Sequence, residues 1–464
     1  MPEVDPAVLH AVAKGRPTGS SSIIQGKIMT RDPRTIIEDA PMSALQITAV
    51  AVAFGLNALD GFDVLSISFA APGIAAEWGI DRAALGIVLS MELIGMAVGS
   101  VLLGGVADRI GRRATILGCL VVMSIGMLMV TQADGIVSLS IWRVLTGLGI
   151  GGMLASINAV TAEFANRRRR NLALAVMVIG YPIGAVVGGT IAAFLLKGGD
   201  WRAVFEFGAI VTACFIPIVW FLVPEPVQFL VSRRPAGALE KVNRTLARMG
   251  HGPVDGLPAP TPEEEGASVA DILKPGLRRI TILLTIAYFA HIVSFYFILK
   301  WVPKIVVDLG YPPAQAASVL VWANVGGAVG GAIFGLLAQR FALKPMTVVV
   351  LALSSVMIAL FGAAGVRSLA GLAALACISG LFTNSAVVGL YTIFARAFPT
   401  HVRATGTGFA IGIGRGGAAL SPILAGFLFA AGLPLAGVAI ALALGSLIAA
   451  VALSGVKLRF DGAK

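Results

Sequence analysis

The chain has 464 residues, of which 57% are hydrophobic and only 13% are charged, and its mean hydropathy is +0.90. These values lie far outside the range of soluble proteins and indicate a polytopic membrane protein. The formal net charge of +11 comes largely from basic residues in short loops, so it does not indicate a nucleic-acid partner. The three cysteines lie within apolar runs and show neither a disulfide framework nor metal-ligand spacing, so no metal or cofactor is expected.

The N-terminal residues 1–44 are polar and have no apolar core, which favours a cytoplasmic tail, mobile up to about Arg34, over a signal peptide. Twelve apolar runs long enough to cross a bilayer follow. They lie at about 46–71, 83–106, 114–132, 137–162, 172–196, 204–223, 280–302, 314–338, 346–365, 368–394, 404–430 and 433–455.

The predicted fold is therefore an all-α membrane protein of twelve transmembrane helices in two pseudo-symmetric six-helix bundles. The bundles are residues 45–223 and 276–456, joined by a cytoplasmic loop at 224–275 that contains a short amphipathic helix at about 236–249. A cytoplasmic tail at 457–464 completes the chain.

Basic residues gather in the loops that follow the even-numbered spans, such as Arg109 to Arg113 and Arg167 to Arg170. The positive-inside rule then places both termini and the central loop in the cytoplasm, with the bacterial inner membrane as the expected location. The loop segment 104–113 recurs in degraded form at 335–344, about half a chain later. Such parallel halves enclose a substrate site near mid-membrane in many transporters.

Two aspartates, Asp60 and Asp63, lie inside the first apolar run and share one helical face. An Asp at the centre of a bilayer costs about 2.5–3.5 kcal/mol by insertion scales, so two on one face indicate a functional role. Glu92 in the second span is a further intramembrane acid whose partner the sequence does not reveal. The acidic pair predicts proton coupling, substrate contact or both.

The loop after the second span reads G-x-x-x-D-R-x-G-R-R from Gly104 to Arg113. The glycines at 104 and 111 permit close backbone approach and a tight turn. Asp108 can pair with an arginine or with a helix N-terminus, which would make a cytoplasmic latch between the halves. The competing explanation is that the basic residues of this loop serve only to set the orientation of the chain in the membrane. The predicted gating residues are Gly104, Asp108, Arg109, Arg112 and Arg403.

Two arginines lie within spans. Arg143 needs a partner or an aqueous cavity, or else it snorkels to the outer interface. It is about 30 Å along a helix from Glu163, too far for a direct pair. Arg415, surrounded by glycines near mid-membrane, is the predicted contact for an anionic substrate, against the alternative of a fixed pair with Asp60, Asp63 or Glu92.

Further candidates are polar or aromatic. His291 either relays protons or hydrogen-bonds a neighbour. Glu163, near the end of its span, is a further candidate for proton coupling, and there a gate contact competes with simple exposure. Aromatic side chains can stack on a ring-bearing substrate, although ordinary packing explains most such residues. The predicted substrate contacts, beyond the acidic pair and the two arginines, are Asn158, Tyr288, Trp322, Phe382 and Tyr391.

The loop pattern from Gly104 to Arg113 resembles the signature of the major facilitator superfamily, and the twelve-span plan extends the resemblance over the whole chain. Within it, the D-G-x-D segment at 60–63, the leader Glu38 to Ser43, the segment Pro224 to Pro226 and the segment Arg403 to Gly408 leading to Arg415 resemble the aromatic acid:proton symporters. The chain departs from that pattern after the eighth span, where Gln339 and Lys344 stand in place of Asp and His.

The resemblance implies proton coupling through Asp60 and Asp63, a gate at Gly104 and Asp108, and functional charges at Arg143, Glu163, Arg403 and Arg415. We therefore expect a proton-coupled importer of an aromatic carboxylate such as a hydroxybenzoate, working as a monomeric unit in the lipid bilayer. The alternatives are symport of an aliphatic or quinate-like acid, or of a sugar. A non-transporting sensor and a membrane enzyme are disfavoured, since no added signalling domain and no nucleophile or cofactor constellation is present.

Overall fold

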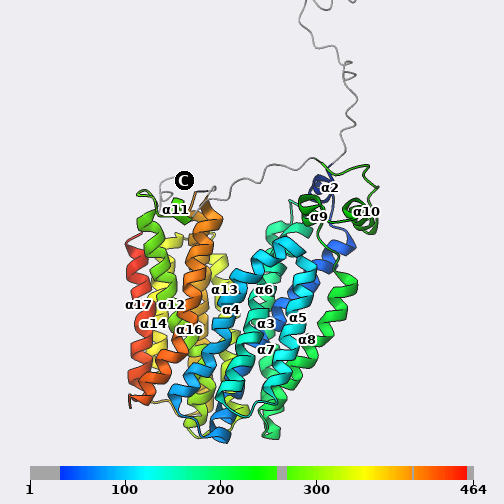
Figure 1. Cartoon of the computed structure of the whole chain (residues 1–464). Coiled ribbons are helices and arrows are strands. Elements are labelled where there is room, and N and C mark those ends of the chain that lie inside the picture. The colour runs from blue at the N-terminus through cyan, green and yellow to red at the C-terminus, as the bar shows by residue number, and fades with distance from the viewer. Residues whose placement is uncertain (1–31, 259–268, 400–401, 457–464) are drawn as a thin grey trace, which may run out of the picture.

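The computed structural model describes residues 32–258, 269–399 and 402–456, and this part of the chain is helical without a strand (Figure 1). Within it, twelve helices are long and apolar enough to span a membrane. They are α3 (Ala44–Trp78), α4 (Arg82–Ile110), α5 (Arg112–Val130), α6 (Ile136–Phe164), α7 (Arg170–Leu195), α8 (Arg202–Leu222), α12 (Arg278–Asp308), α13 (Pro313–Leu337), α14 (Leu343–Ala363), α15 (Leu369–Ala397), α16 (Arg403–Ala430) and α17 (Leu435–Ser454).

Each expected span is present, and most helices are longer than the apolar runs that predicted them. The first shows why, because α3 starts at a capping box formed by Ser43 and Gln46 and continues to Gly79, which ends it in a left-handed conformation. Capping groups lie outside the apolar window, so hydropathy alone places the ends of a helix too far inward. The helix turn η1 (Leu196–Gly198) extends α7 in the same way.

The spans pack into two groups, α3 to α8 and α12 to α17, as Figure 1 shows. In the first group α4 packs along α6 and α3 along α7, and in the second α13 packs along α15 and α14 along α17. The groups meet mainly through α4 against α16, α7 against α13 and α3 against α12. These six helices therefore make most of the contact between the halves.

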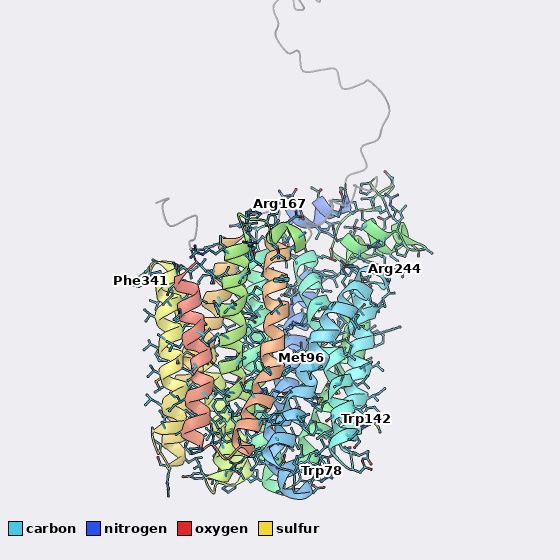
Figure 2. The ribbon with its side chains drawn as sticks, turned by 60° about the vertical axis from the view of Figure 1, so that its left-hand side comes forward. Trp78, Met96, Trp142, Arg167, Arg244 and Phe341 are labelled. Carbon is cyan, nitrogen blue, oxygen red and sulfur yellow. The ribbon has the colours of Figure 1, made fainter. Side chains whose placement is uncertain are left out.

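The short helices α2 (Pro33–Asp39), α9 (Val227–Arg233), α10 (Ala238–Arg248) and α11 (Val269–Ile272) all lie at one end of the bundle, called here the linker end (Figure 1). Arg167 and Arg244 mark this end in Figure 2, and Trp78 and Trp142 mark the opposite, far end. The amphipathic helix expected at 236–249 is α10, whose apolar side is buried.

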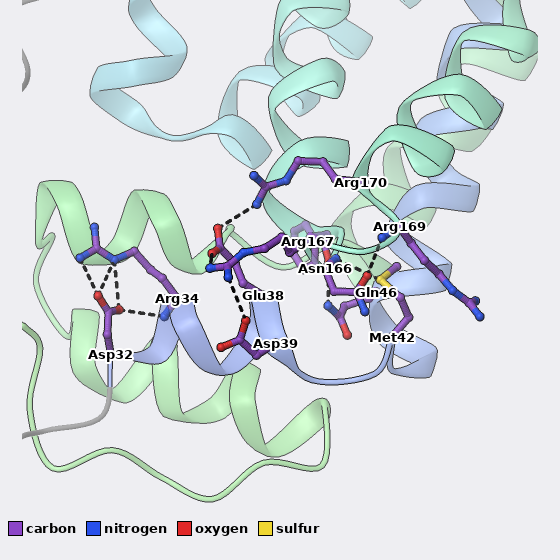
Figure 3. Close-up of polar contacts among 11 residues, drawn as sticks. Asp32, Arg34, Glu38, Asp39, Met42, Gln46, Asn166, Arg167, Arg169 and Arg170 are labelled. Carbon is purple, nitrogen blue, oxygen red and sulfur yellow. Dashed lines mark hydrogen bonds and ion pairs between the residues drawn. The ribbon is translucent and has the colours of Figure 1, made fainter. Parts of the chain in front are cut away.

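The leader segment at 38–46 clamps the turn between α6 and α7 (Figure 3). Glu38 forms ion pairs with Arg167 at 3.1 Å and Arg170 at 2.9 Å, while the Asn166 side chain donates to Ala40 O at 2.9 Å. The Gln46 amide donates to Phe164 O at 2.7 Å. The two arginines hold the pKa of Glu38 below its usual value. These contacts give the leader motif a structural function.

The expected polar tail therefore contains ordered structure, since α2 begins at Pro33 behind the capping carboxylate of Asp32. Hydropathy did not reveal this helix, because seven residues with a capping Asp and a proline give only a weak helical signal. The rest of the expected tail up to residue 31, residues 259–268 of the expected central loop and the expected tail from 457 lie outside the described residues.

Candidate functional site

The acidic pair lies where α3 crosses α7. Gly61, between the two aspartates, allows this crossing, because a Cβ at that position would overlap the backbone carbonyl of Tyr181. Asp60 and Asp63 are 1% and 0% exposed in the middle of the bundle. The glycine of the D-G-x-D segment thus serves helix contact, and the two acids are held inside the protein by it.

Neither carboxyl group has a hydrogen-bond partner among the described residues, although all four oxygens are buried. An ionised carboxylate without donors in such surroundings is unfavourable by many kcal/mol, so a group of this kind neutralises by binding a proton. The environment of Asp60 and Asp63 is therefore suited to two neutral, protonated acids.

Glu92 on α4 is the centre of a buried charge cluster. Its Oε2 forms an ion pair with the guanidinium of Arg143 from α6 and lies 3.6 Å from the ammonium of Lys300 on α12. All three side chains are 0% exposed. Arg143 also donates to Asp63 O at 3.2 Å, and its guanidinium lies 5.3 Å from the ring centre of Phe205. Arg143 therefore has a buried partner, and the snorkelling alternative is wrong.

Lys300 is a functional candidate that sequence reasoning missed. It reaches across the interface from α12 and donates to Val64 O on α3 as well as contacting Glu92. Lys300 lies two residues before the expected end of its span, a position typical of a lysine that snorkels to the membrane surface. The sequence alone therefore does not reveal that this lysine is buried. The available signal was Glu92, an intramembrane acid in need of a cation.

Arg415 lies halfway between the ends of the bundle, on α16. It is half-buried and donates to Met96 O on α4 at 3.4 Å, and Figure 2 places Met96 at mid-height. Among the described residues it forms no ion pair, although it is near enough to Asp60 for an electrostatic interaction. The alternative of a fixed ion pair is therefore not what the structure shows.

Four of the five tyrosines of the chain are close enough to interact electrostatically with one another around this arginine. They are Tyr181, Tyr288, Tyr296 and Tyr391. The hydroxyls of Tyr288 and Tyr391 are 2.9 Å apart and their ring centres 5.6 Å apart. Tyr288 is buried, whereas Tyr391 is 43% exposed. A cation beside phenolic hydroxyls can hold a carboxylate and offer hydrogen bonds to further polar groups of a ligand.

The other predicted residues do not join this group. His291 is buried between Ser446 Oγ at 3.0 Å and Thr383 O at 2.9 Å, which is the hydrogen-bonding alternative of the sequence analysis. Asn158 is exposed and donates to Leu154 O of its own helix. Trp322 is 50% exposed and Phe382 is half-buried. No described polar contact links these four to Arg415.

The predicted gate residues lie at the linker end, four of them in the first half and Arg403 in the second. Asp108 pairs with Arg112 at 2.9 Å, and Arg112 also pairs with Glu163 at 3.3 Å. Arg109 is exposed at the end of α4, and Arg403 at the start of α16 donates to Phe398 O at 3.3 Å. The ion pairs of Asp108 and Arg112 join neighbouring helices of the first group, so these two residues form no latch between the halves within the described part of the chain.

The two glycines of the loop pattern differ. Gly111 has φ +110°, and the Glu225 carboxylate lies 2.6 Å from where its Cβ would be. That carboxylate accepts a hydrogen bond from the Arg112 backbone amide at 2.6 Å and so satisfies the first N–H group of α5. Gly104 has room, with only Ala155 near, so its expected close approach is absent here.

Three polar contacts between the halves lie between the far end and the middle of the bundle. Arg82 pairs with Asp308 at 3.0 Å at the far end, Lys300 meets Glu92 further in, and Arg415 reaches Met96 at mid-height. Beyond Met96 the α4 residues Val101 and Leu102 are 75% and 59% exposed. On α16 a Cβ at residue 408 or 412 would meet nothing within 4 Å. The halves are therefore closed at the far end and apart at the linker end.

Two six-helix groups, with buried charges at their contact and one end closed, define a membrane transporter that works by moving its halves against each other. The sequence profile of the Major Facilitator Superfamily matches residues 53–303 and 284–460, and the chain belongs to that family.

Characterised relatives cover most of the chain. A gallate transporter from Pseudomonas putida is 29% identical over 87% of this chain and 90% of its own length. A 3-(3-hydroxy-phenyl)propionate transporter from Escherichia coli K12 is 29% identical, covering 88% and 93%. A 4-hydroxybenzoate transporter from Pseudomonas putida is 29% identical, covering 84% and 87%. The crystal structure of a D-xylose-proton symporter shares the fold, with a TM-score of 0.69 at 16% identity over 88% of this chain and 96% of that one.

Proposed function

We propose that the protein imports an aromatic carboxylate together with protons by alternating access. The substrate class is supported by the relatives, whose names specify gallate, 3-(3-hydroxy-phenyl)propionate and 4-hydroxybenzoate. Arg415 would hold the carboxylate, and the neighbouring tyrosines would contact the ring and its hydroxyls. Of the other predicted contacts, Asn158 would act later on the path toward the linker end, and Trp322 and Phe382, near the middle of α13 and α15, would act at the level of Arg415.

The observation that carries the proton coupling is the burial of Asp60 and Asp63 without a hydrogen-bond donor. Two such groups are stable when protonated and become acceptable as carboxylates once water or a cation reaches them. We propose that they take up protons when the far end is open and release them toward the linker end. Arg143, fixed by Glu92, would then be a structural counter-charge near Asp63.

We propose that the linker end faces the cytoplasm of a bacterium, since it carries the arginine-rich turn at 167–170 and the basic helix α10. The structure would then be the inward-facing state, after closure on the outer side. The network of Asp108, Arg112 and Glu163 would change partners when the linker end closes, with Arg403 approaching from the other half. Residues 45–223 and 276–456 would move as the two bodies.

Gradient-driven uptake tests the proposal. Purified protein in proteoliposomes with an imposed inward proton gradient is given radiolabelled gallate, 4-hydroxybenzoate, benzoate, quinate and D-xylose. Wild type is compared with Asp60→Asn, Asp63→Asn and Arg415→Ala. The matched controls are Asp134→Asn, an exposed acid whose side chain bonds only Ser138 among the described residues, and Arg367→Ala, an exposed arginine.

We expect uptake of at least one aromatic acid that an uncoupler abolishes. Asp60→Asn and Asp63→Asn should lose accumulation against a gradient, and Arg415→Ala should raise the KM for the acid at least tenfold, since a charged hydrogen bond contributes about 1.5–3 kcal/mol. The two control variants should transport like wild type. Uptake of quinate or xylose without any aromatic acid would refute the substrate class, and accumulation by both Asn variants would refute the coupling.

A further inference from the structure

A basic cavity of about 220 Å³ lies at the linker end, outside the transport path described above. It is enclosed by the start of α5, the end of α8 and one face of α10. Its walls carry four cationic side chains, from Arg113, Lys241, Arg244 and Arg248, and one acidic side chain, from Glu225. A volume of this size is below that of most drug-sized ligand sites and suits a small charged group.

The cations of the cavity are available to a ligand. Lys241, Arg244 and Arg248 are spaced three and four residues apart, which places them on one face of α10, and all are exposed. Lys241 and Arg248 have no carboxylate partner in the described part of the chain. Arg244 pairs with Glu240 at 2.8 Å, but with 69% and 76% of the side chains exposed this pair is weak.

The back wall is built by Arg113 and Trp220. The Arg113 guanidinium lies 5.0 Å from the Trp220 ring centre and donates to Trp220 O, while its buried Nε has no acceptor among the described residues. The acidic side chain of the lining, Glu225, already accepts hydrogen bonds from the backbone amides of Arg112 and Arg113. The cavity therefore has an excess of positive charge and an unused donor.

We propose that this cavity binds the phosphodiester headgroup of an anionic phospholipid. The level of the cavity relative to the membrane favours a lipid over a soluble anion. Trp220 and Phe221, in the last turn of the span α8, are 57% and 70% exposed, as expected for side chains at the level of lipid headgroups. The acyl chains would cover these rings, and the phosphate would meet Arg113 and the α10 cations. This inference does not depend on the transported substrate.

Lipid binding to the purified full chain tests the assignment. Delipidated protein in neutral detergent is titrated with phosphatidylglycerol, with phosphatidylcholine or with inorganic phosphate, and the bound lipid is counted by native mass spectrometry while the melting temperature is recorded. The pocket variant carries Lys241→Gln, Arg244→Gln and Arg248→Gln. The control variant removes three exposed arginines elsewhere at the linker end, by Arg168→Gln, Arg340→Gln and Arg396→Gln.

We expect wild type and the control variant to retain and be stabilised by phosphatidylglycerol, and neither to respond to phosphatidylcholine. The pocket variant should bind phosphatidylglycerol on the order of a hundredfold more weakly, since each basic residue near a membrane surface contributes about fivefold. If the triple variant does not fold, Lys241→Gln alone should show the fivefold step. Equal losses in both variants, an unchanged affinity in the pocket variant, or equal stabilisation by inorganic phosphate would overturn the lipid site.

Discussion

Replacing Glu92 by glutamine should be among the most damaging conservative substitutions in the chain. The change removes the charge that compensates Arg143 and Lys300 and leaves two cations in a fully buried site. Breaking a buried pair in this way costs about 3–5 kcal/mol, because the remaining charge stays desolvated. For a unit the size of one six-helix half this corresponds to a melting temperature lower by on the order of 10 °C.

The assay is thermal unfolding of the purified protein in one detergent, with Glu240→Gln as the matched control. Glu240 pairs with Arg244 on an exposed helix face, so its loss should cost only about 0.3–0.5 kcal/mol. Adding Lys300→Met to Glu92→Gln removes one of the two stranded cations and should restore part of the loss. A Glu92→Gln protein that melts like Glu240→Gln, or a double variant that shows simple additivity, would refute the charge-cluster argument.

Three further predictions concern other parts of the molecule. Because arginines lower the pKa of Glu38, the ion pairs of the leader should stabilise the linker end above about pH 4.5 and should be lost as the pH falls through the lowered pKa. Wild type and Glu38→Gln should therefore differ in protease sensitivity at pH 7 and become alike at low pH. A Cβ at residue 86 would overlap Pro422 O and lie 3.2 Å from Gly426 Cα, so Gly86→Val should hold the far end open and abolish short crosslinking between cysteines placed at 82 and 308; unchanged crosslinking would contradict this. His291→Gln should lower the melting temperature and keep gradient-driven uptake, whereas lost uptake at full stability would indicate a proton relay.

Sequence reasoning predicted the fold well because each span carries its own signal. A run of about twenty apolar residues is readable without knowledge of any neighbour. The amphipathic helix α10 was also found from local periodicity alone. The helix α2 was not predicted, because its seven residues are held by ion pairs of Glu38 with Arg167 and Arg170. Those partners are more than a hundred residues away, and a local pattern cannot show them.

The candidate site was predicted only in part for the same reason. Asp60, Asp63 and Arg415 stand out as charges inside apolar runs, and the structure places all three at mid-depth. The sequence could not pair Glu92 with Arg143, because the contact depends on how α4 crosses α6. Tyr181 and Tyr296 were not selected either, since an isolated tyrosine in a span looks like ordinary packing.

Lys300 links the charge cluster to the movement of the halves. Glu92 receives one cation from its own half, Arg143, and a second from the other half, Lys300. Separation of the halves at the far end must withdraw Lys300 from both Glu92 and Val64 O. A buried charge that loses its partner needs water or a proton in exchange. Opening at the far end should therefore change the hydration or the protonation of this charge cluster, and a change of protonation would couple the movement to a proton gradient.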